Sequence, residues 1–176
     1  MMVLVVGGSA SGKSEYAEKA AVFLGNKKLY LATMRPFGAE AEKKIQRHQR
    51  MRSQKGFDSL DCYLDLSNAD INGYDTVLVE CMSNLLANEL YRKENTVQWE
   101  TVVEKLCNDL IILKPRTKHL VVVSNDVSRD GNRYDLETAR YIQLMEQLNA
   151  RLFRAADSVV EVVCSIPIPL KGELPC

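Results

Sequence analysis

Glycines, a lysine and a serine lie close together at the start of the chain, in a spacing that could hold phosphate. Residues 7–14, GGSASGKS, fit the pattern G-x-x-x-x-G-K-[S/T]. In such a loop the backbone N–H groups turn inward, the lysine reaches the β- and γ-phosphates, and the serine ligates magnesium. The segment predicts a site for ATP or GTP with Mg²⁺, with Gly7, Gly8, Ser9, Ala10, Ser11, Gly12, Lys13 and Ser14 as its residues. The alternative is a glycine-rich turn with an incidental lysine.

An acidic residue ends a later apolar run, DTVLVE, at Glu80. Enzymes with this type of phosphate loop need an acidic group at the end of a neighbouring strand, either to hold the metal or to activate a nucleophile. Burying a lone carboxylate is costly, so we expect Glu80 at the carboxyl edge of the sheet, where open α/β sheets bind ligands. Glu80 and Ser14 are therefore the predicted metal-binding residues. A plain strand-end carboxylate facing solvent is the alternative interpretation.

The segment 39–53 is basic and contains His48, one of two histidines in the chain. On a helix, Lys44, His48 and Arg52 would share one face. Cationic neighbours disfavour the imidazolium ion, so His48 should be neutral near pH 7, with a lone pair that could attack an α-phosphorus while Arg52 contacts phosphate. From these residues alone we favour a solvated basic face with an incidental histidine. His119, at the start of an apolar run, is most simply structural.

Short β-branched runs alternate with segments of helical period, which predicts an α/β fold with a mostly parallel sheet covered by helices. The expected strands are 2–6, 28–32, 76–80, 119–124 and 159–164. The expected helices are 13–24, 39–52, 83–93, 97–113 and 135–156, the last long enough to break. The tail, IPIPLKGELPC, is rich in proline and is expected to be an irregular strap.

The composition limits the class of protein. With 176 residues, 46% hydrophobic and 26% charged, the chain is expected to form a single nucleotide-binding domain over 1–176. Lys plus Arg (23) equals Asp plus Glu (23), so no global positive field attracts nucleic acid or an anionic membrane. The five cysteines form no C-x-x-C pair, which argues against disulfides and zinc. No secretory leader or membrane-spanning run is evident, and we expect a cytoplasmic protein.

Several motifs occur together in an order that identifies a family. They are GGSASGKS at 7–14, LYLAT at 29–33, IQRH at 45–48, VLVECMSNLLANEL at 77–90, VVVSNDV at 121–127, LNARLFRAADSV at 148–159 and IPIPLKG near the end. In this order the sequence resembles the bifunctional adenosylcobinamide kinase and adenosylcobinamide-phosphate guanylyltransferase family of cobalamin biosynthesis. The resemblance covers nearly the whole chain.

The resemblance implies a three-layer P-loop fold and two linked reactions. The first phosphorylates the aminopropanol hydroxyl of adenosylcobinamide with ATP or GTP. In the second, a histidine takes GMP from GTP and passes it to the new phosphate. His48 falls on the position of that histidine, which reverses our preference from the residues alone. Glu80 falls on the family's acidic strand-end residue, and 7–14 on its phosphate loop. The resemblance also implies a homotrimer with sites between subunits.

Three segments depart from the family's usual pattern: 52–61, 125–133 and 140–146. In the family these segments shape the corrinoid and guanine side of the site, so the resemblance speaks most directly for the triphosphate side. Two alternatives therefore remain beside the bifunctional enzyme. One is a divergent P-loop kinase of a corrinoid or another small alcohol, without guanylyl transfer. The other is a nucleotide-binding regulator without turnover.

Overall fold

A computed structural model describes residues 1–36, 54–92, 98–127 and 134–176. Its strands are β1 Met2–Gly7, β2 Lys28–Ala32, β3 Phe57–Asp61, β4 Thr76–Glu80, β5 His119–Asn125, β6 Ser158–Val163 and β7 Ile166–Lys171. Its helices are α1 Lys13–Leu24, α3 Met82–Leu90, α4 Trp99–Leu113 and α5 Leu136–Ala155, with short 3₁₀ turns at Leu66–Asn68 and Lys114–Arg116.

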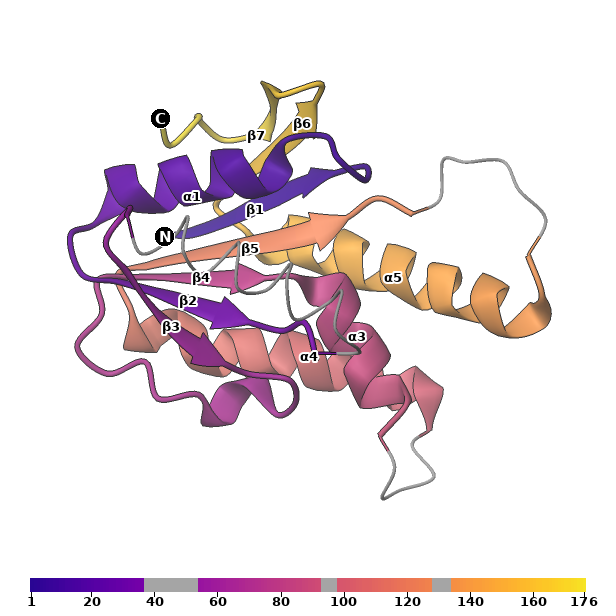
Figure 1. The fold of residues 1–176 in the computed structure, drawn as a ribbon. Coiled ribbons are helices and arrows are strands. Elements are labelled where there is room, and N and C mark those ends of the chain that lie inside the picture. Colours follow the sequence, from indigo (N-terminus) through magenta and orange to yellow (C-terminus); the bar gives the residue numbers. More distant parts are fainter. Residues whose placement is uncertain (37–53, 93–97, 128–133) are drawn as a thin grey trace.

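The seven strands form one sheet in the order β3-β2-β4-β5-β1-β6-β7. All neighbours run parallel except β6 and β7, which form an antiparallel hairpin. The strand that carries the phosphate loop, β1, therefore lies inside the sheet, with β5 on one side and β6 on the other (Figure 1). This is the predicted fold: a three-layer, P-loop NTPase-like α/β domain with a mostly parallel sheet.

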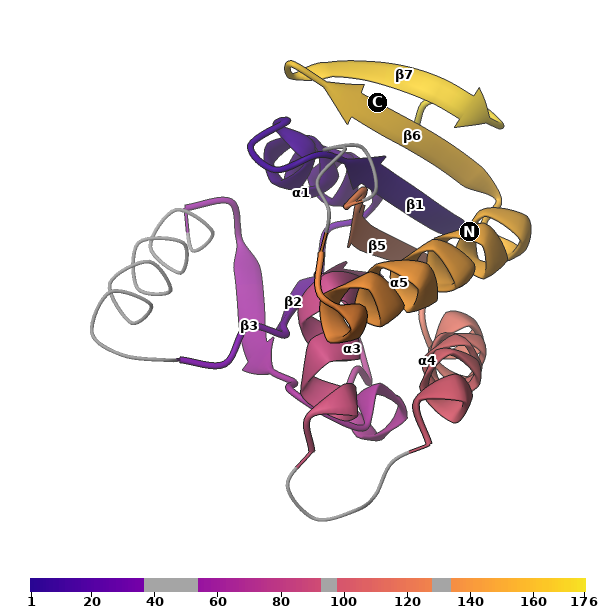
Figure 2. The ribbon, with the colours of Figure 1, turned by 90° about the vertical axis from the view of Figure 1, so that its right-hand side faces the viewer.

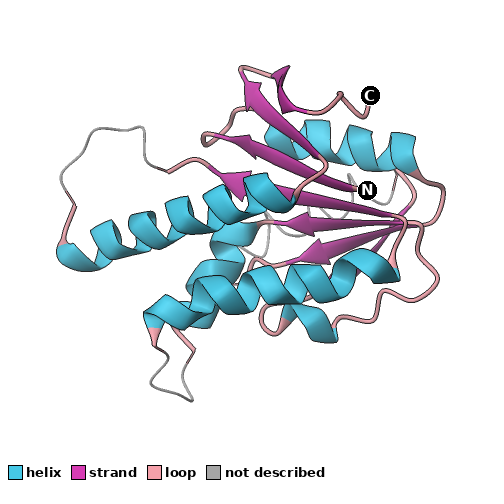
Figure 3. Ribbon diagram, turned by 180° about the vertical axis from the view of Figure 1, so that it is seen from behind, coloured by secondary structure: helices cyan, strands magenta, loops and turns pink. Residues whose placement is uncertain are grey.

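Helices cover both faces of the sheet, as parallel strands that are apolar on both sides require. Figure 2 shows α1 on one face and α3, α4 and α5 on the other. The core under α1 includes Val3, Val5 and Ala17, whereas Leu4 and Leu106 belong to the larger core on the opposite face. Figure 3, from behind, shows the long helices α4 and α5 lying across the strands.

The expected and observed elements agree closely where the sequence pattern is strongest. Helix 13–24 and strands 28–32 and 76–80 match α1, β2 and β4 residue for residue. Helix α5 begins at an Asp135 cap, whose side chain accepts a hydrogen bond from the Thr138 N–H, and it continues unbroken to Ala155. The expected helix 39–52 lies outside the described residues.

At the edges of the sheet one strand was missed and one prediction was wrong. The segment FDSLD forms β3, an edge strand that was missed because three of its five residues are exposed and the apolar run is short. The tail predicted to be an irregular strap forms β7 instead. Pro167 and Pro169 are two residues apart, so their nitrogens face the same side of the strand, and an edge strand can leave one side unpaired.

Within the described ranges, no helix has the length and apolar character needed to cross a membrane.

Candidate active site

The phosphate loop connects the end of β1 to the start of α1. The Ser11 N–H donates to the Gly8 carbonyl at 3.3 Å, and the Tyr16 N–H donates to the Gly12 carbonyl at 3.1 Å as the helix begins. Gly12 has φ 92°, a left-handed conformation that glycine adopts without strain. The predicted strand, loop and helix are therefore all present in the arrangement that presents backbone N–H groups to an anion.

The β6–β7 hairpin packs against the back of this loop. The Ser165 N–H, at the hairpin turn, donates to the Ser11 carbonyl at 2.7 Å. A Cβ on Gly12 would lie 2.6 Å from the Ser165 Oγ, and one on Gly7 would lie 2.6 Å from the Val162 carbonyl. Both glycines are therefore required by close contact with the hairpin, which fixes the loop from the side opposite the phosphates.

Lys13 is buried, and its ammonium group donates to the Gly8 carbonyl at 3.0 Å. The bond curls the lysine side chain back over its own loop. The contact of Lys13 with the β- and γ-phosphates stays a prediction of the motif.

The fold brings Ser14 and Glu80 together from α1 and β4. The Ser14 hydroxyl donates to Glu80 Oε1. The other carboxylate oxygen, Glu80 Oε2, is buried and has no hydrogen-bond partner among the described residues. A hydroxyl and a carboxylate are oxygen ligands of the kind Mg²⁺ prefers, and an unpaired buried carboxylate oxygen is costly without a cation or a donor. These two side chains therefore fit the metal that a triphosphate would bring.

Thr33, just beyond the end of β2, fixes the backbone around Glu80. Its N–H donates to the Glu80 carbonyl at 3.0 Å, and its hydroxyl receives the Cys81 N–H at 2.6 Å and donates to the Cys81 carbonyl at 2.9 Å. The Asn88 amide, on α3, donates in turn to the Thr33 carbonyl at 2.8 Å. Glu80 is therefore held by the neighbouring strand and by the helix that follows it.

A cavity of about 550 Å³ opens beside the phosphate loop. Its walls come from the loop, from the end of β5 and from the start of α5, with Gly8, Ser9, Asn125, Asp126, Val127, Tyr134, Thr138, Tyr141 and Ile142 lining it. Burial raises the pKa of Tyr141 to about 12, so this phenol stays protonated and donates to the Ser83 carbonyl at 3.0 Å. The cavity combines aromatic surface with polar groups next to the phosphate site, as a binding site for an organic acceptor requires.

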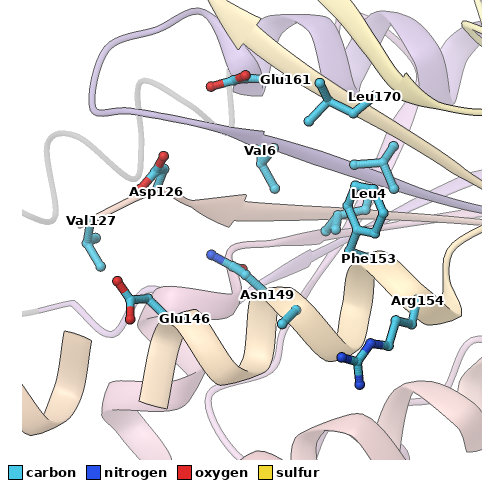
Figure 4. Close-up of a pocket in the computed structure, with 12 residues that line it drawn as sticks. Leu4, Val6, Asp126, Val127, Glu146, Asn149, Phe153, Arg154, Glu161 and Leu170 are labelled. Carbon is cyan, nitrogen blue, oxygen red and sulfur yellow. The ribbon is translucent and has the colours of Figure 1, made fainter. Parts of the chain in front are cut away.

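A second hollow, of about 450 Å³, lies between α5 and strands β1, β6 and β7. Figure 4 shows Leu4 and Phe153 toward one end of it and the carboxylates of Asp126, Glu146 and Glu161 toward the other. Asp126 and Val127 line both hollows, so the chain after β5 separates them.

The structure brings together some of the predicted site residues and leaves two undescribed. Gly7 to Ser14 and Glu80 meet at the carboxyl edge of the sheet. His48 and Arg52 lie outside the described residues, so their positions relative to the loop stay predictions. His119 begins β5 at the opposite end of the strands, consistent with the structural role expected for it.

Sequence reasoning did not assign roles to Ser83, Asn125 and Tyr141, which also line or support the site. A signal existed for Asn125, because two polar residues, Ser124 and Asn125, end the apolar run of β5 at the same edge as Glu80. For Ser83 and Tyr141 no local signal distinguishes them from other residues of their helices.

Comparison with known proteins gives a consistent family. The family model described as cobinamide kinase / cobinamide phosphate guanyltransferase matches residues 3–170. This chain belongs to that family. A bifunctional adenosylcobalamin biosynthesis protein of Salmonella typhimurium is 31% identical over 97% of this chain and 100% of its own length. The protein of the same name in Escherichia coli is 30% identical over the same shares of the two chains.

The bifunctional adenosylcobalamin biosynthesis protein of Pseudomonas aeruginosa is 27% identical over 98% of this chain and 99% of its own length. Among solved structures, a KaiC-like protein of Pyrococcus horikoshii aligns with 91% of this chain and 69% of its own, at 12% identity and a TM-score of 0.49. The RadB recombinase aligns with 91% and 73%, at 16% identity and a TM-score of 0.48.

Proposed function

We propose that this protein phosphorylates adenosylcobinamide with ATP or GTP and then transfers GMP from GTP to the product, through a guanylylated His48. The observation that carries the proposal is the pairing of Ser14 with Glu80 beside Lys13 and the phosphate loop, in a chain whose family match spans 3–170. The match to a family of kinases and guanyltransferases over residues 3–170 favours an enzyme over a nucleotide-binding regulator.

In the kinase step the acceptor hydroxyl attacks the γ-phosphorus, the bond to the β,γ-bridging oxygen breaks, and the nucleoside diphosphate leaves with the electron pair. The loop N–H groups hold the phosphates in place, and the Lys13 ammonium neutralises charge on the β and γ oxygens. Ser14 and Glu80 would hold Mg²⁺, which supplies further charge neutralisation when bound. Positioning and electrostatics then account for most of the acceleration, since phosphoryl transfer needs little covalent help from protein.

In the second step a His48 nitrogen attacks the α-phosphorus of GTP and pyrophosphate leaves. The phosphate of the phosphorylated acceptor then attacks the same phosphorus and releases the histidine. Arg52, with the other cations of its segment, would contact the phosphates. The roles of His48 and Arg52 rest on the family resemblance, since both residues lie outside the described ranges.

Three further properties belong to the same proposal: magnesium dependence, a homotrimer in solution, and location in the cytoplasm. The first is supported by the unpaired oxygen of Glu80 beside Ser14. The homotrimer is supported by the family resemblance alone, and the cytoplasmic location by a composition without a membrane-spanning run.

The test uses the purified full chain with Mg²⁺, adenosylcobinamide and GTP labelled at either the γ- or the α-phosphorus. We expect γ label on the corrinoid, and its loss by about 10³-fold in Lys13→Ala, because the lysine stabilises charge that develops in the transition state. We expect α label on the protein that is labile to acid and stable to base, absent from His48→Ala, which still transfers the γ label.

Lys19→Ala is the matched control, because Lys19 lies on the same helix and pairs with Glu15 at 2.9 Å on the exposed surface. It should retain both labels. Unchanged γ transfer in Lys13→Ala would refute the phosphate-loop assignment. Corrinoid phosphorylation without any α label on the protein would show that the protein is a kinase without guanylyl transfer. An α label that survives in His48→Ala would show that a residue other than His48 is the nucleophile.

A further inference from the structure

Strand β5 lies between β1 and β4 in the sheet, so its carboxyl end falls between the phosphate loop and Glu80. The last residue of β5 is Asn125, which pairs in register with Gly7. The following N–H, of Asp126, donates to the Gly7 carbonyl at 3.1 Å and fixes this end of the strand against the loop. Asn125 therefore sits at the edge where the γ-phosphate and the oxygen that attacks it must meet.

Two elements outside β5, the helices α3 and α5, hold Asn125 in one orientation. Its amide Nδ2 donates to the Ser83 hydroxyl, on α3, at 2.7 Å. The Tyr141 hydroxyl, on α5, fixes Ser83 through its carbonyl at 3.0 Å. The Asn149 amide, also on α5, donates to the Asn125 carbonyl at 3.0 Å, and Figure 4 shows Asn149 directed from the helix toward the strands. The Ser124 hydroxyl donates to Asn149 Oδ1 at 2.6 Å.

One atom of this arrangement has no partner. Asn125 Oδ1 is buried and makes no hydrogen bond within the described part of the chain, although Asn125 lines the cavity beside the phosphate loop. Leaving a buried amide oxygen unpaired is unfavourable, and most such atoms in native proteins are satisfied. The side chain of Asn125 is oriented by α3 and α5, and its oxygen is unpaired in a residue that lines a cavity, so it is placed to receive a donor that arrives with the substrate.

We infer that Asn125 Oδ1 accepts a hydrogen bond from the hydroxyl group of the phosphoryl acceptor and so directs that oxygen at the γ-phosphorus. The acceptor class is a primary or secondary alcohol on an organic substrate that fills the cavity walled by the first turns of α5. An amide is not a base, so Asn125 does not take the proton; the proton passes to solvent as the new phosphate ester ionises. The inference rests on the proposed kinase step and adds the residue that positions its nucleophile.

Asn125→Ala tests the inference through the ratio of two reactions. With Mg²⁺, γ-labelled GTP and adenosylcobinamide, we expect kcat for transfer to the corrinoid to fall about 30-fold, the effect of losing one hydrogen bond made at the reacting oxygen. The slow hydrolysis of GTP in the absence of corrinoid should change by less than about threefold, and so should the affinity for GTP, because neither uses the acceptor hydroxyl. Asn125→Asp, which keeps an acceptor oxygen, should recover part of the transfer.

Ser158→Ala is the matched control, because it removes a hydrogen bond of another buried residue, from the Ser158 hydroxyl to the Glu173 carbonyl at 2.7 Å, at the start of β6 and outside the contacts that orient Asn125. It should lower the free energy of unfolding as much as Asn125→Ala does, while transfer stays within about threefold of wild type. Equal loss of transfer, hydrolysis and GTP affinity in Asn125→Ala would overturn the inference, and so would transfer at the wild-type rate. A wild-type protein that binds GTP but phosphorylates no corrinoid would instead refute the proposed function, before any variant is compared.

Discussion

Two groups of buried and half-buried polar side chains, one beside α3 and α4 and one at the carboxyl edge of the sheet, differ in how completely their members are paired. The first group links α3, α4 and the residue before the 3₁₀ turn Leu66–Asn68. Each of its charged side chains lies close to one of opposite charge. Lys105 Nζ lies 2.7 Å from Glu89, 3.1 Å from Asp65 and 3.1 Å from Asp109, while Arg92 lies 3.0 Å from Asp65. Glu89 also accepts the Asp65 N–H at 2.7 Å. We call these five residues the paired cluster.

The second group lies at the phosphate loop and is incompletely satisfied within the described chain. Ser11 Oγ, Glu80 Oε2 and Asn125 Oδ1 are all buried without a hydrogen-bond partner there. A folded protein tolerates such atoms where the missing partners arrive with a ligand. The comparison teaches that the paired cluster is complete within the described chain, whereas the atoms at the phosphate loop leave places for partners that a ligand could supply; unpaired atoms such as Thr76 Oγ1 and His119 Nδ1, at the other end of the strands, are not part of this second group.

Helix α3 connects the two groups. Ser83, in its first turn, supports Asn125, and Glu89, in its last turn, belongs to the paired cluster. The paired cluster therefore helps to fix the position of α3. Helix α3 in turn places Ser83 beside Asn125. The following predictions separate the two roles.

The largest effect is expected from Glu80→Gln, which removes charge from the unsatisfied group. Corrinoid phosphorylation should fall about 100-fold, since the metal loses an anionic oxygen. The free energy of unfolding should stay the same or rise, because an unpaired buried carboxylate is replaced by a neutral amide. Urea denaturation and steady-state kinetics on the same preparation measure both. A large loss of stability would show that Glu80 is structural and would break the comparison.

Glu89→Gln is the counterpart in the paired cluster. We expect a loss of about 2 kcal/mol in the free energy of unfolding, because Lys105 loses a buried charged partner. The kcat of the folded protein should stay within about threefold of wild type, because Glu89 does not line the cavity. Urea midpoints and activity at low temperature test this expectation. Activity that falls as steeply as in Glu80→Gln would mean that the two groups cannot be separated.

The smallest effect concerns pH. Burial alone would raise the pKa of Asp65, but hydrogen bonds from Lys105 and Arg92 outweigh it and hold that pKa below 3.8. The folded state therefore binds fewer protons than the unfolded state, so the stabilisation is complete above about pH 4 and is lost as the pH falls through the folded pKa. Asp65→Asn should be less stable than wild type at about pH 7, and the difference should shrink below about pH 4.

Urea midpoints across that range measure the difference. Asp70→Asn is the control, because the Asp70 carboxylate accepts from the neighbouring Asn72 amide at 2.8 Å and has no part in the paired cluster. A difference for Asp65→Asn that stayed constant down to the lowest pH would rule out the charge interaction as its cause.

The sequence predicted the elements whose patterns are local and strong. Residues 7–14 indicated the loop, and the apolar run before Glu80 placed that carboxylate at the correct edge, because both signals are complete within a few residues. The edge strands were not predicted. Strand β3 buries too little surface to show a clear period, and the prolines of β7 are tolerated because β7 is an edge strand of the sheet that the described residues form.

The part of the site around Asn125 could not be predicted from any short segment of the sequence. The orientation of Asn125 depends on Ser83, Tyr141 and Asn149, which lie on two other elements, α3 and α5. The paired cluster was missed for the same reason, since Asp65, Glu89 and Lys105 come from three separate segments. The periodicity of the sequence does not indicate which charged side chains will lie together in the fold.

The contact between the phosphate loop and the β6–β7 hairpin has a consequence for the order of synthesis. Strand β1 leaves the ribosome first, yet its two neighbours in the sheet, β5 and β6, are among the last strands made. Ser11 gains its bond from Ser165 later still. Long-range strand pairing of this kind cannot form until both partners have emerged. The residues of the phosphate loop are therefore made well before the strands that flank them, and the loop gains its contact with Ser165 only when the hairpin has docked.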